Sequence, residues 1–387
     1  MVQQIFTKRR MPKHIPYVDG TALKSFLNSA LDFIHSSHQS LDSSRAWICF
    51  WVLHGLDLLG DVDERMDVLA PRSISFLQRL QSAQTGGFAG GIDQVSHVVS
   101  TFAAINALMI IGTTEAYDCI DRAGMYRFLL SLKTPHGSFR TQVDGEDDSR
   151  STYCAVVISS LLNIQTPELL AGVPEYLVRC QTFEGGFGAT PGNEAHGGYT
   201  YCAVAALSLM DHFGSIDSES LLRWAVNKQP AYDGGFQGRT NKLVDTCYTF
   251  WQGGVFPIIQ SHLGPVAQNI GNDAIGKHLF DQLQLQDYCL ICCQDTRGGF
   301  SDHPEKGRDY YHTCYTMSGL SIAQHNDIHL AVNMINHHTQ EMPQLSRTVT
   351  QLNGGTVLEA THPIFNIRLP KCTKALQYFR SRPNINV

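Results

Sequence analysis

The feature of this sequence that most constrains its fold is a short glycine turn that recurs five times. The copies are "TGGF", "HGSF", "EGGF", "DGGF" and "RGGF", and they end at Phe88, Phe139, Phe187, Phe236 and Phe300. Their spacings are 51, 48, 49 and 64 residues, and self-similarity at a nearly fixed period is typical of repeat architectures. The longer last spacing predicts an insertion around residues 260–275.

Each turn lies between two different helical patterns. The pattern before the turn is amphipathic, as in "SISFLQRLQ" and "VPEYLVRCQ", and the pattern after it is apolar nearly all round, as in "STFAAINALMII" and "YTYCAVAALSLM". Amphipathic helices cover a surface and wholly apolar helices are buried, so each repeat is predicted to pair an outer with an inner helix. About six pairs would give an all-α fold, an α/α toroid (barrel). An open solenoid is the alternative, but the apolarity of the inner set favours closure.

Composition supports a large buried interior. Hydrophobic residues make up 43% of the 387 residues and charged residues 17%, which argues against disorder. We expect residues 1–20 to form a flexible basic tail and residues 21–387 to form one barrel domain. A net charge of −6 argues against nucleic-acid binding. No signal peptide or membrane-spanning run is recognisable, and the eleven cysteines lie mostly in apolar patterns, so we expect a cytoplasmic protein with reduced thiols.

One segment, "GRTNKLVDTCYTFW" at residues 238–251, concentrates polar and metal-binding side chains. Most inner helices carry a threonine near their start, at positions 101, 152, 200, 246 and 313. Aligned on this threonine, Asp245 and His312 occupy the same repeat position, so Asp245, Cys247 and His312 are predicted to meet on one rim of the barrel. Together they are good zinc ligands, and three protein ligands leave a position open for a substrate thiol. The alternative is a helix-capping aspartate beside a core cysteine.

The same rim is predicted to bind an anion. His196, Arg239 and Lys242 all fall in turns before inner helices, where helix N-termini add positive charge, and a diphosphate would gain charge-assisted hydrogen bonds there. The alternative is a solvated loop with scattered charges. Asp302 could hold Mg²⁺ against a diphosphate, although a loop aspartate is often only a turn residue. A single CxxC, Cys289 to Cys292, has no second pair and is not interpreted as a metal site.

The inner helices are also rich in aromatic residues. These are Trp47, Trp51, Phe102, Tyr153, Tyr199, Tyr201, Tyr248, Trp251 and Tyr311. An aromatic stripe is often only core, but a deep aromatic cavity beneath a cationic rim suits an apolar chain that carries a diphosphate head.

From about residue 20 to 380 the chain resembles the β subunits of protein farnesyltransferases, within the protein prenyltransferase family. The resemblance rests on "LDSSRAWICFWVLH", "EAHGGYTYCAVAAL", "DGGFQGRTNKLVDTCYTFWQ", "GRDYYHTCYTMSGLSIAQH" and "THPIFNI". It implies a heterodimer with an α subunit. It also implies transfer of a farnesyl group from farnesyl diphosphate to the zinc-bound cysteine thiolate of CaaX proteins such as small GTPases.

The resemblance also implies residue roles. Catalytic roles fall to Asp245, Cys247, His312, Tyr248 and Lys242, with zinc held by the first three and Mg²⁺ by Asp302. Prenyl diphosphate binding falls to His196, Arg239, Lys242, Tyr248, Arg150, Tyr153, Tyr199, Trp251, Trp47 and Phe102. Peptide binding falls to Trp47, Trp51, Ser44, His97 and Tyr311. A further lysine at the diphosphate belongs to the α subunit, so this chain would hold only part of the site.

Two residues favour a farnesyl over a geranylgeranyl substrate. In the family a bulky tryptophan closes the cavity floor of farnesyl enzymes, and Trp47 matches it. Geranylgeranyl type I enzymes, the nearest alternative, lack the Mg²⁺ carboxylate that Asp302 matches. Phe102 departs from the usual tyrosine, and Val99 and Ser100 depart from the family's pocket for the last CaaX residue.

Two more distant alternatives remain. Terpene cyclases share the barrel, but their D-x-D-D motif is absent, because the nearest stretch is "GEDD". A non-catalytic helical-repeat scaffold that binds peptides would need no metal ligands in register.

Overall fold

The computed structural model describes residues 17–32, 36–263, 278–336, 345, 350 and 354–383. Most of the expected basic tail and most of the expected insertion at 260–275 lie outside these residues. Among the described residues, no helix is both long enough and apolar enough to cross a membrane.

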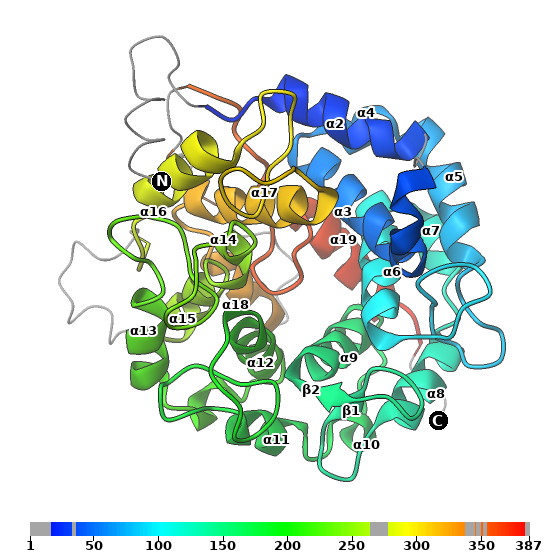
Figure 1. Cartoon of the computed structure of the whole chain (residues 1–387). Coiled ribbons are helices and arrows are strands. Elements are labelled where there is room, and N and C mark those ends of the chain that lie inside the picture. The colour runs from blue at the N-terminus through cyan, green and yellow to red at the C-terminus, as the bar shows by residue number, and fades with distance from the viewer. Residues whose placement is uncertain are drawn as a thin grey trace.

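The inner helices form a closed ring (Figure 1). They are α3 (Arg45–Leu58), α6 (Val98–Ile111), α9 (Ser149–Leu161), α12 (Gly197–Leu209), the pair α14 (Tyr248–Trp251) and α15 (Val255–Leu263), and α17 (Tyr310–Gln324). Each packs against the next around the ring, and α17 packs against α3, which closes it. The α/α toroid predicted from the sequence is therefore confirmed, and the open solenoid is excluded.

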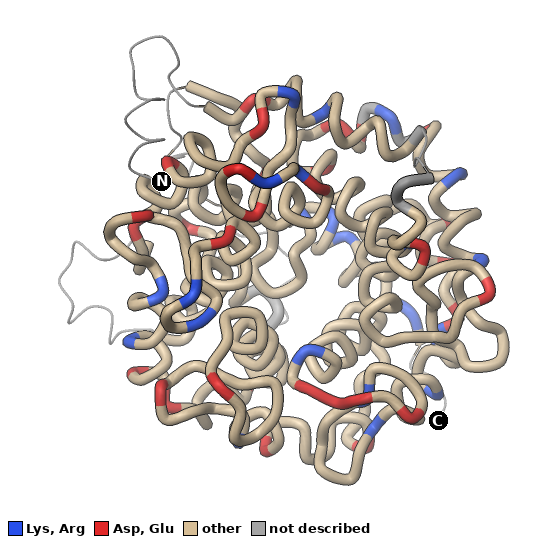
Figure 2. The backbone as a smooth tube through the Cα atoms, viewed as in Figure 1, with Lys and Arg blue, Asp and Glu red and all other residues tan. Residues whose placement is uncertain are grey.

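A second layer of helices surrounds this ring. The outer helices are α2 (Gly20–Asp32), α5 (Met66–Gln78), α8 (Arg122–Leu132), α11 (Val173–Arg179), α13 (Ser218–Val226) and α16 (Gln282–Asp287), which continues as the π-helix η4 (Tyr288–Cys293). Shorter elements connect the layers: η1 (Ser36–Ser44), α4 (Asp61–Glu64), α7 (Thr114–Asp118), α10 (Pro167–Leu170), η2 (Phe213–Ser215) and α18 (Leu330–Asn336). The two short strands β1 (Phe139–Arg140) and β2 (Asp147–Asp148) pair antiparallel. Charged residues lie mostly on loops and outer helices (Figure 2).

The glycine turns link neighbouring repeats. Gly185 has φ of 107°, and a Cβ atom there would overlap the backbone of Ser220 in the next outer helix. Only glycine fits such a position, because it combines positive φ with close backbone approach. The phenylalanine that follows each turn is buried, and in several repeats its N–H donates to a threonine hydroxyl 13 residues later. This bond measures 2.9 Å for Phe88, 2.8 Å for Phe187 and 2.9 Å for Phe300.

The repeat register differs from the alignment made on sequence. In the fourth repeat, the residue 13 after Phe236 is Thr249, not Thr246. A second marker of register is the residue nine positions after the turn phenylalanine, whose N–H donates to the carbonyl oxygen of that phenylalanine. Asp245 makes this bond to Phe236 at 3.1 Å, and Asp309 makes it to Phe300 at 3.2 Å in the next repeat. Asp245 therefore corresponds to Asp309, and the expectation that it shares a repeat position with His312 is wrong. The alignment failed because this segment carries threonines at two positions three residues apart.

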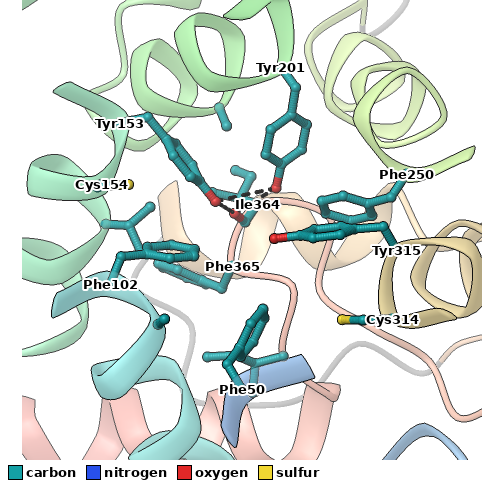
Figure 3. Packing of buried hydrophobic residues seen from close by; sticks show 14 of the residues in the cluster. Phe50, Phe102, Tyr153, Cys154, Tyr201, Phe250, Cys314, Tyr315, Ile364 and Phe365 are labelled. Atoms are coloured by element: carbon teal, nitrogen blue, oxygen red, sulfur yellow. Dashed lines mark hydrogen bonds between the residues drawn. The ribbon is translucent and has the colours of Figure 1, made fainter. Parts of the chain in front are cut away.

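A C-terminal loop, residues 361–368, closes the far end of the ring, and α19 (Leu369–Arg380) follows it. The hydroxyls of Tyr153 and Tyr201 both donate to the carbonyl oxygen of Ile364, at 2.7 and 2.9 Å, and Asn106 donates to that of Phe365 at 3.1 Å. Figure 3 shows both tyrosines pointing their hydroxyls at this loop. The opposite end, where the inner helices begin, is therefore where a ligand can enter.

Candidate active site

The candidate site lies at the N-terminal ends of the inner helices. A cavity of about 230 Å³ opens there, and it is lined by Arg150, His196, Gly198, Tyr199, Cys202, Tyr248, Trp251 and Tyr311. His196, the N-cap of α12, accepts the Gly198 N–H at 3.1 Å, and Asp245, three residues before α14, accepts the Cys247 N–H at 2.9 Å. Capping satisfies N–H groups that a helix start leaves unpaired, so the fold itself brings polar side chains to this rim.

Asp245, Cys247 and His312 meet at this rim. Their potential ligand atoms all lie within 4.8 Å of one another, the only such group of three or more found in the described part of the chain. His312 Nε2 lies 3.4 Å from Asp245 Oδ1, and a tetrahedral zinc site separates its ligand atoms by roughly 3.5 Å. The Asp245 carboxylate accepts the Cys247 N–H and is a potential ligand at once, so a structural role and a ligand role of the D-x-C motif do not exclude each other. The donor set and spacing fit Zn²⁺.

The electrostatics of these three residues also suit a cation. Burial raises the pKa of the Cys247 thiol, and the Asp245 carboxylate raises it further. Burial alone would lower the pKa of His312, but hydrogen bonds to Asp245 and Asp309 raise it to about 9. A divalent ion would take the place of these protons, because zinc binds thiolate and neutral imidazole.

Asp309 is a candidate functional residue that the sequence analysis missed. Its Oδ2 lies 2.7 Å from His312 Nδ1, on the side of the ring opposite the candidate ligand atom Nε2. A carboxylate in this position fixes the orientation of a ligand histidine and raises its basicity. The available signal was an acidic residue three positions before a candidate ligand, at a helix start, but that pattern is common in capping.

We expect Asp309→Asn to weaken zinc binding by about 10- to 100-fold, because the amide keeps the cap but loses the charge that orients His312. Competition with a chelator of known affinity measures this. Asp121→Asn, at the N-cap of outer helix α8, is the matched control and should leave zinc affinity unchanged. Equal zinc affinity in both variants would refute the role of Asp309.

The part of the site predicted to bind an anion centres on His196. Because its Nδ1 accepts the Gly198 N–H, a neutral ring carries its proton on Nε2, which lies 3.0 Å from the Tyr248 hydroxyl. Burial lowers the pKa of His196 to about 4, and nearby Arg239 contributes to the shift. A neutral His196 therefore donates this N–H to the Tyr248 hydroxyl, and burial raises the pKa of Tyr248, so the phenol keeps its own proton to donate into the cavity. Arg239 pairs with Glu194 at 3.4 Å, and Lys242 is exposed on the same loop.

The other predicted residues fall into four places. Arg150, Tyr199, Trp251 and Tyr311 line the cavity. Asp302 lies next to the three-residue cluster, since its carbonyl accepts the Thr246 N–H at 2.8 Å, but its carboxylate is not part of the cluster. Trp47, Trp51, Phe102 and Tyr153 lie outside the cavity lining and are joined to Tyr311 by successive ring contacts. Ser44 and His97 lie at the starts of α3 and α6.

Comparison with known proteins decides the family. Residues 20–367 match the model of the prenyltransferase alpha-alpha toroid domain. The chain belongs to this prenyltransferase family. It is 42% identical to the protein farnesyltransferase subunit beta of Dictyostelium discoideum, over 97% of this chain and 87% of that protein. It is 36% identical to the subunit of the same name from Arabidopsis thaliana, over 92% of this chain and 81% of that protein.

Among solved structures, the geranylgeranyltransferase-I of Candida albicans in complex with GGPP superposes with a TM-score of 0.68. The alignment covers 94% of this chain and 98% of that one at 22% identity, so it shows the shared fold. The resemblance to farnesyltransferase β subunits inferred from the motifs is thereby confirmed, and this prenyltransferase family member is an enzyme that transfers a prenyl group.

Proposed function

We propose that this chain is the catalytic β subunit of a heterodimeric protein farnesyltransferase. It would transfer a farnesyl group from farnesyl diphosphate to the cysteine of C-terminal CaaX proteins. The observation that carries the proposal is the meeting of Asp245, Cys247 and His312 beside a cavity with cationic and neutral donors. The names of the most similar relatives support the farnesyl assignment. We further propose one barrel domain over residues 21–387 and a cytoplasmic location.

The donors of the rim are suited to a diphosphate leaving group. In the reaction, the substrate sulfur forms a bond to the first isoprenoid carbon as the bond from that carbon to the diphosphate oxygen breaks. His196, Tyr248 and Arg239 would donate hydrogen bonds to the departing oxygens, and Lys242 would add charge from the same loop. Donors that are already in place stabilise developing charge without reorganisation.

Two metals fit the proposal. Zinc, when held by Asp245, Cys247 and His312, would offer an open position at which a substrate thiol loses its proton. The buried Cys247 and the Asp309-oriented His312 would fix where that position points. Asp302, half-buried on the loop beside Thr246, would hold Mg²⁺ at the diphosphate through a carboxylate oxygen.

A geranylgeranyl substrate is the alternative, and the aromatic wall favours farnesyl. Trp47 packs 5.6 Å from Trp51 and 5.9 Å from Phe102, measured between ring centroids. Three large rings in contact fill space that a longer isoprenoid would need. A geranylgeranyl group would have to displace these packed aromatic side chains, and overpacking a core is destabilising.

We propose that the partner α subunit docks on the turn-bearing end of the toroid. Phe183 and Tyr232 each lie four residues before the turn phenylalanine in adjacent repeats, and they are 97% and 65% exposed. Leu243, near Lys242, is also exposed. Exposed aromatic side chains at equivalent positions are typical of an interface, where aromatics dominate binding energy.

We expect Phe183→Asp combined with Tyr232→Asp to weaken association with the α subunit by at least about 30-fold, because both remove aromatic anchors. The double variant should fold normally, since both side chains are exposed. Val68→Asp, an exposed apolar residue on outer helix α5, is the control. Subunit affinity measured by titration checks this; unchanged affinity of the double variant would place the partner elsewhere.

The function itself is tested by prenyl transfer. The chain, co-expressed with an α subunit, is given labelled farnesyl or geranylgeranyl diphosphate and a CaaX peptide that ends in methionine, with and without zinc chelation. Zinc-dependent farnesyl transfer supports the proposal. Preference for geranylgeranyl would leave the family intact and reject the farnesyl assignment. Absence of transfer by a folded heterodimer with either substrate would favour a binding scaffold.

A further inference from the structure

Helices α14 and α17, which follow or carry the candidate zinc ligands, are in close contact. His312, Thr316 and Gly319 of α17 lie at positions i, i+4 and i+7, so they share one helix face. That face meets α14 and the residues before it. His312 contacts Asp245 at 3.4 Å, and the Thr316 hydroxyl lies 3.5 Å from the Thr246 carbonyl oxygen.

Gly319 is the closest point of this contact. A Cβ atom added to Gly319 would lie under 3.0 Å from three atoms of Thr249, and two of these are its backbone carbonyl carbon and oxygen. Backbone atoms cannot rotate aside as a side-chain end can. Any side chain at position 319 must therefore push α14 and α17 apart.

The chain on the α14 side is shaped to the same contact. The inner helix of this repeat is broken between Trp251 and Val255, where Gly253 donates its N–H to the carbonyl of Tyr248 at 3.3 Å, five residues back. A bond of this span widens the helix locally, and such widenings recur at functional sites. Thr249 lies within this irregular turn, four residues after Asp245 and two after Cys247.

We infer that Gly319 is a positioning residue for the zinc ligands, an inference that rests on the proposed function. Two of the candidate ligands, Asp245 and Cys247, precede α14. The third, His312, lies on α17 seven residues before Gly319 and on the same helix face. The separation of these two helices therefore sets the distance between His312 and the other two ligands. Without a side chain at position 319, the three ligand atoms can gather within 4.8 Å.

The test is zinc affinity of Gly319→Ala in the heterodimer, measured by competition with a chelator. We expect the dissociation constant to rise by at least about tenfold, comparable to losing a partner that orients a ligand. Gly55→Ala is the matched control. Gly55 is also buried in an inner helix, and its added Cβ would meet only side-chain atoms of Leu27 on outer helix α2. Both changes favour helix formation equally, so a general effect on the fold would appear in both.

A second variant covers the case in which Gly319→Ala does not fold. Thr316→Ile enlarges a side chain at the same helix contact, and it too should weaken zinc binding. Thr316→Val keeps the volume and should not. A folded Gly319→Ala, or in its place a folded Thr316→Ile, with wild-type zinc affinity overturns the inference. A wild-type heterodimer that binds no zinc would instead reject the metal in the proposed function.

Discussion

Replacing Cys247 by alanine is expected to remove the bound zinc and to lower prenyl transfer by more than about 100-fold. The thiol is one of three candidate ligands in the cluster. Loss of a residue that only orients a ligand costs up to about 100-fold in affinity or activity, so loss of a ligand itself should cost more. Zinc content per heterodimer and turnover of a CaaX peptide are the two measurements. Both should fall together, because in the proposed function the metal is what deprotonates the substrate thiol.

A suitable control for Cys247→Ala removes another buried cysteine, so that the loss of packing is the same. Cys247 and Cys372 are both buried, at 5% and 1% exposure, and neither forms a disulfide. Removing either sulfur leaves a cavity of about the size of a methyl group, which costs about 1 kcal/mol. Cys372→Ala, on α19, should therefore keep zinc and activity. Normal zinc content in a Cys247→Ala variant would remove Cys247 from the ligand set.

The ring could be predicted from the sequence because its signals are local. Each turn has its own glycine and phenylalanine, and each helix shows its own apolar pattern, so no contact between distant residues had to be known. The threonine register was harder, because Thr246 and Thr249 are both near the helix start. The three candidate ligands nevertheless meet, since residues at neighbouring helix starts share one rim even when they differ by one helical turn.

Other features depend on contacts that local pattern does not encode. Asp309 could not be distinguished from an ordinary helix cap, because its contact with His312 requires the side-chain geometry. The loop at 361–368 has no periodicity, and its role in closing the ring depends on Tyr153 and Tyr201, about 160 or more residues earlier. Gly319 lies in a helix that is otherwise a regular inner helix, and only its partner Thr249 reveals why a glycine stands there.

Substitution of Trp47 by threonine is expected to let the enzyme use a 20-carbon diphosphate. Trp47 lies at the far end of a series of ring contacts that starts in the cavity at Tyr311 and passes through Trp51, with centroid distances of 5.6 Å at both steps. Removing this ring frees space beneath the cavity. One methylene that does not fit a hydrophobic pocket costs about 1 to 3 kcal/mol, and a fourth isoprene unit adds five carbons.

The ratio of farnesyl to geranylgeranyl transfer is therefore expected to fall by at least about 100-fold in Trp47→Thr. Competition between the two diphosphates for one CaaX peptide measures this ratio directly, so a variant of lowered stability still gives a valid result. Trp224→Thr removes the same ring from outer helix α13, where it packs against Gly186 away from the cavity, and the ratio should stay at its wild-type value. If both variants keep the wild-type ratio, the depth of the cavity is set elsewhere, and the closing loop at Ile364 and Phe365 becomes the next position to change.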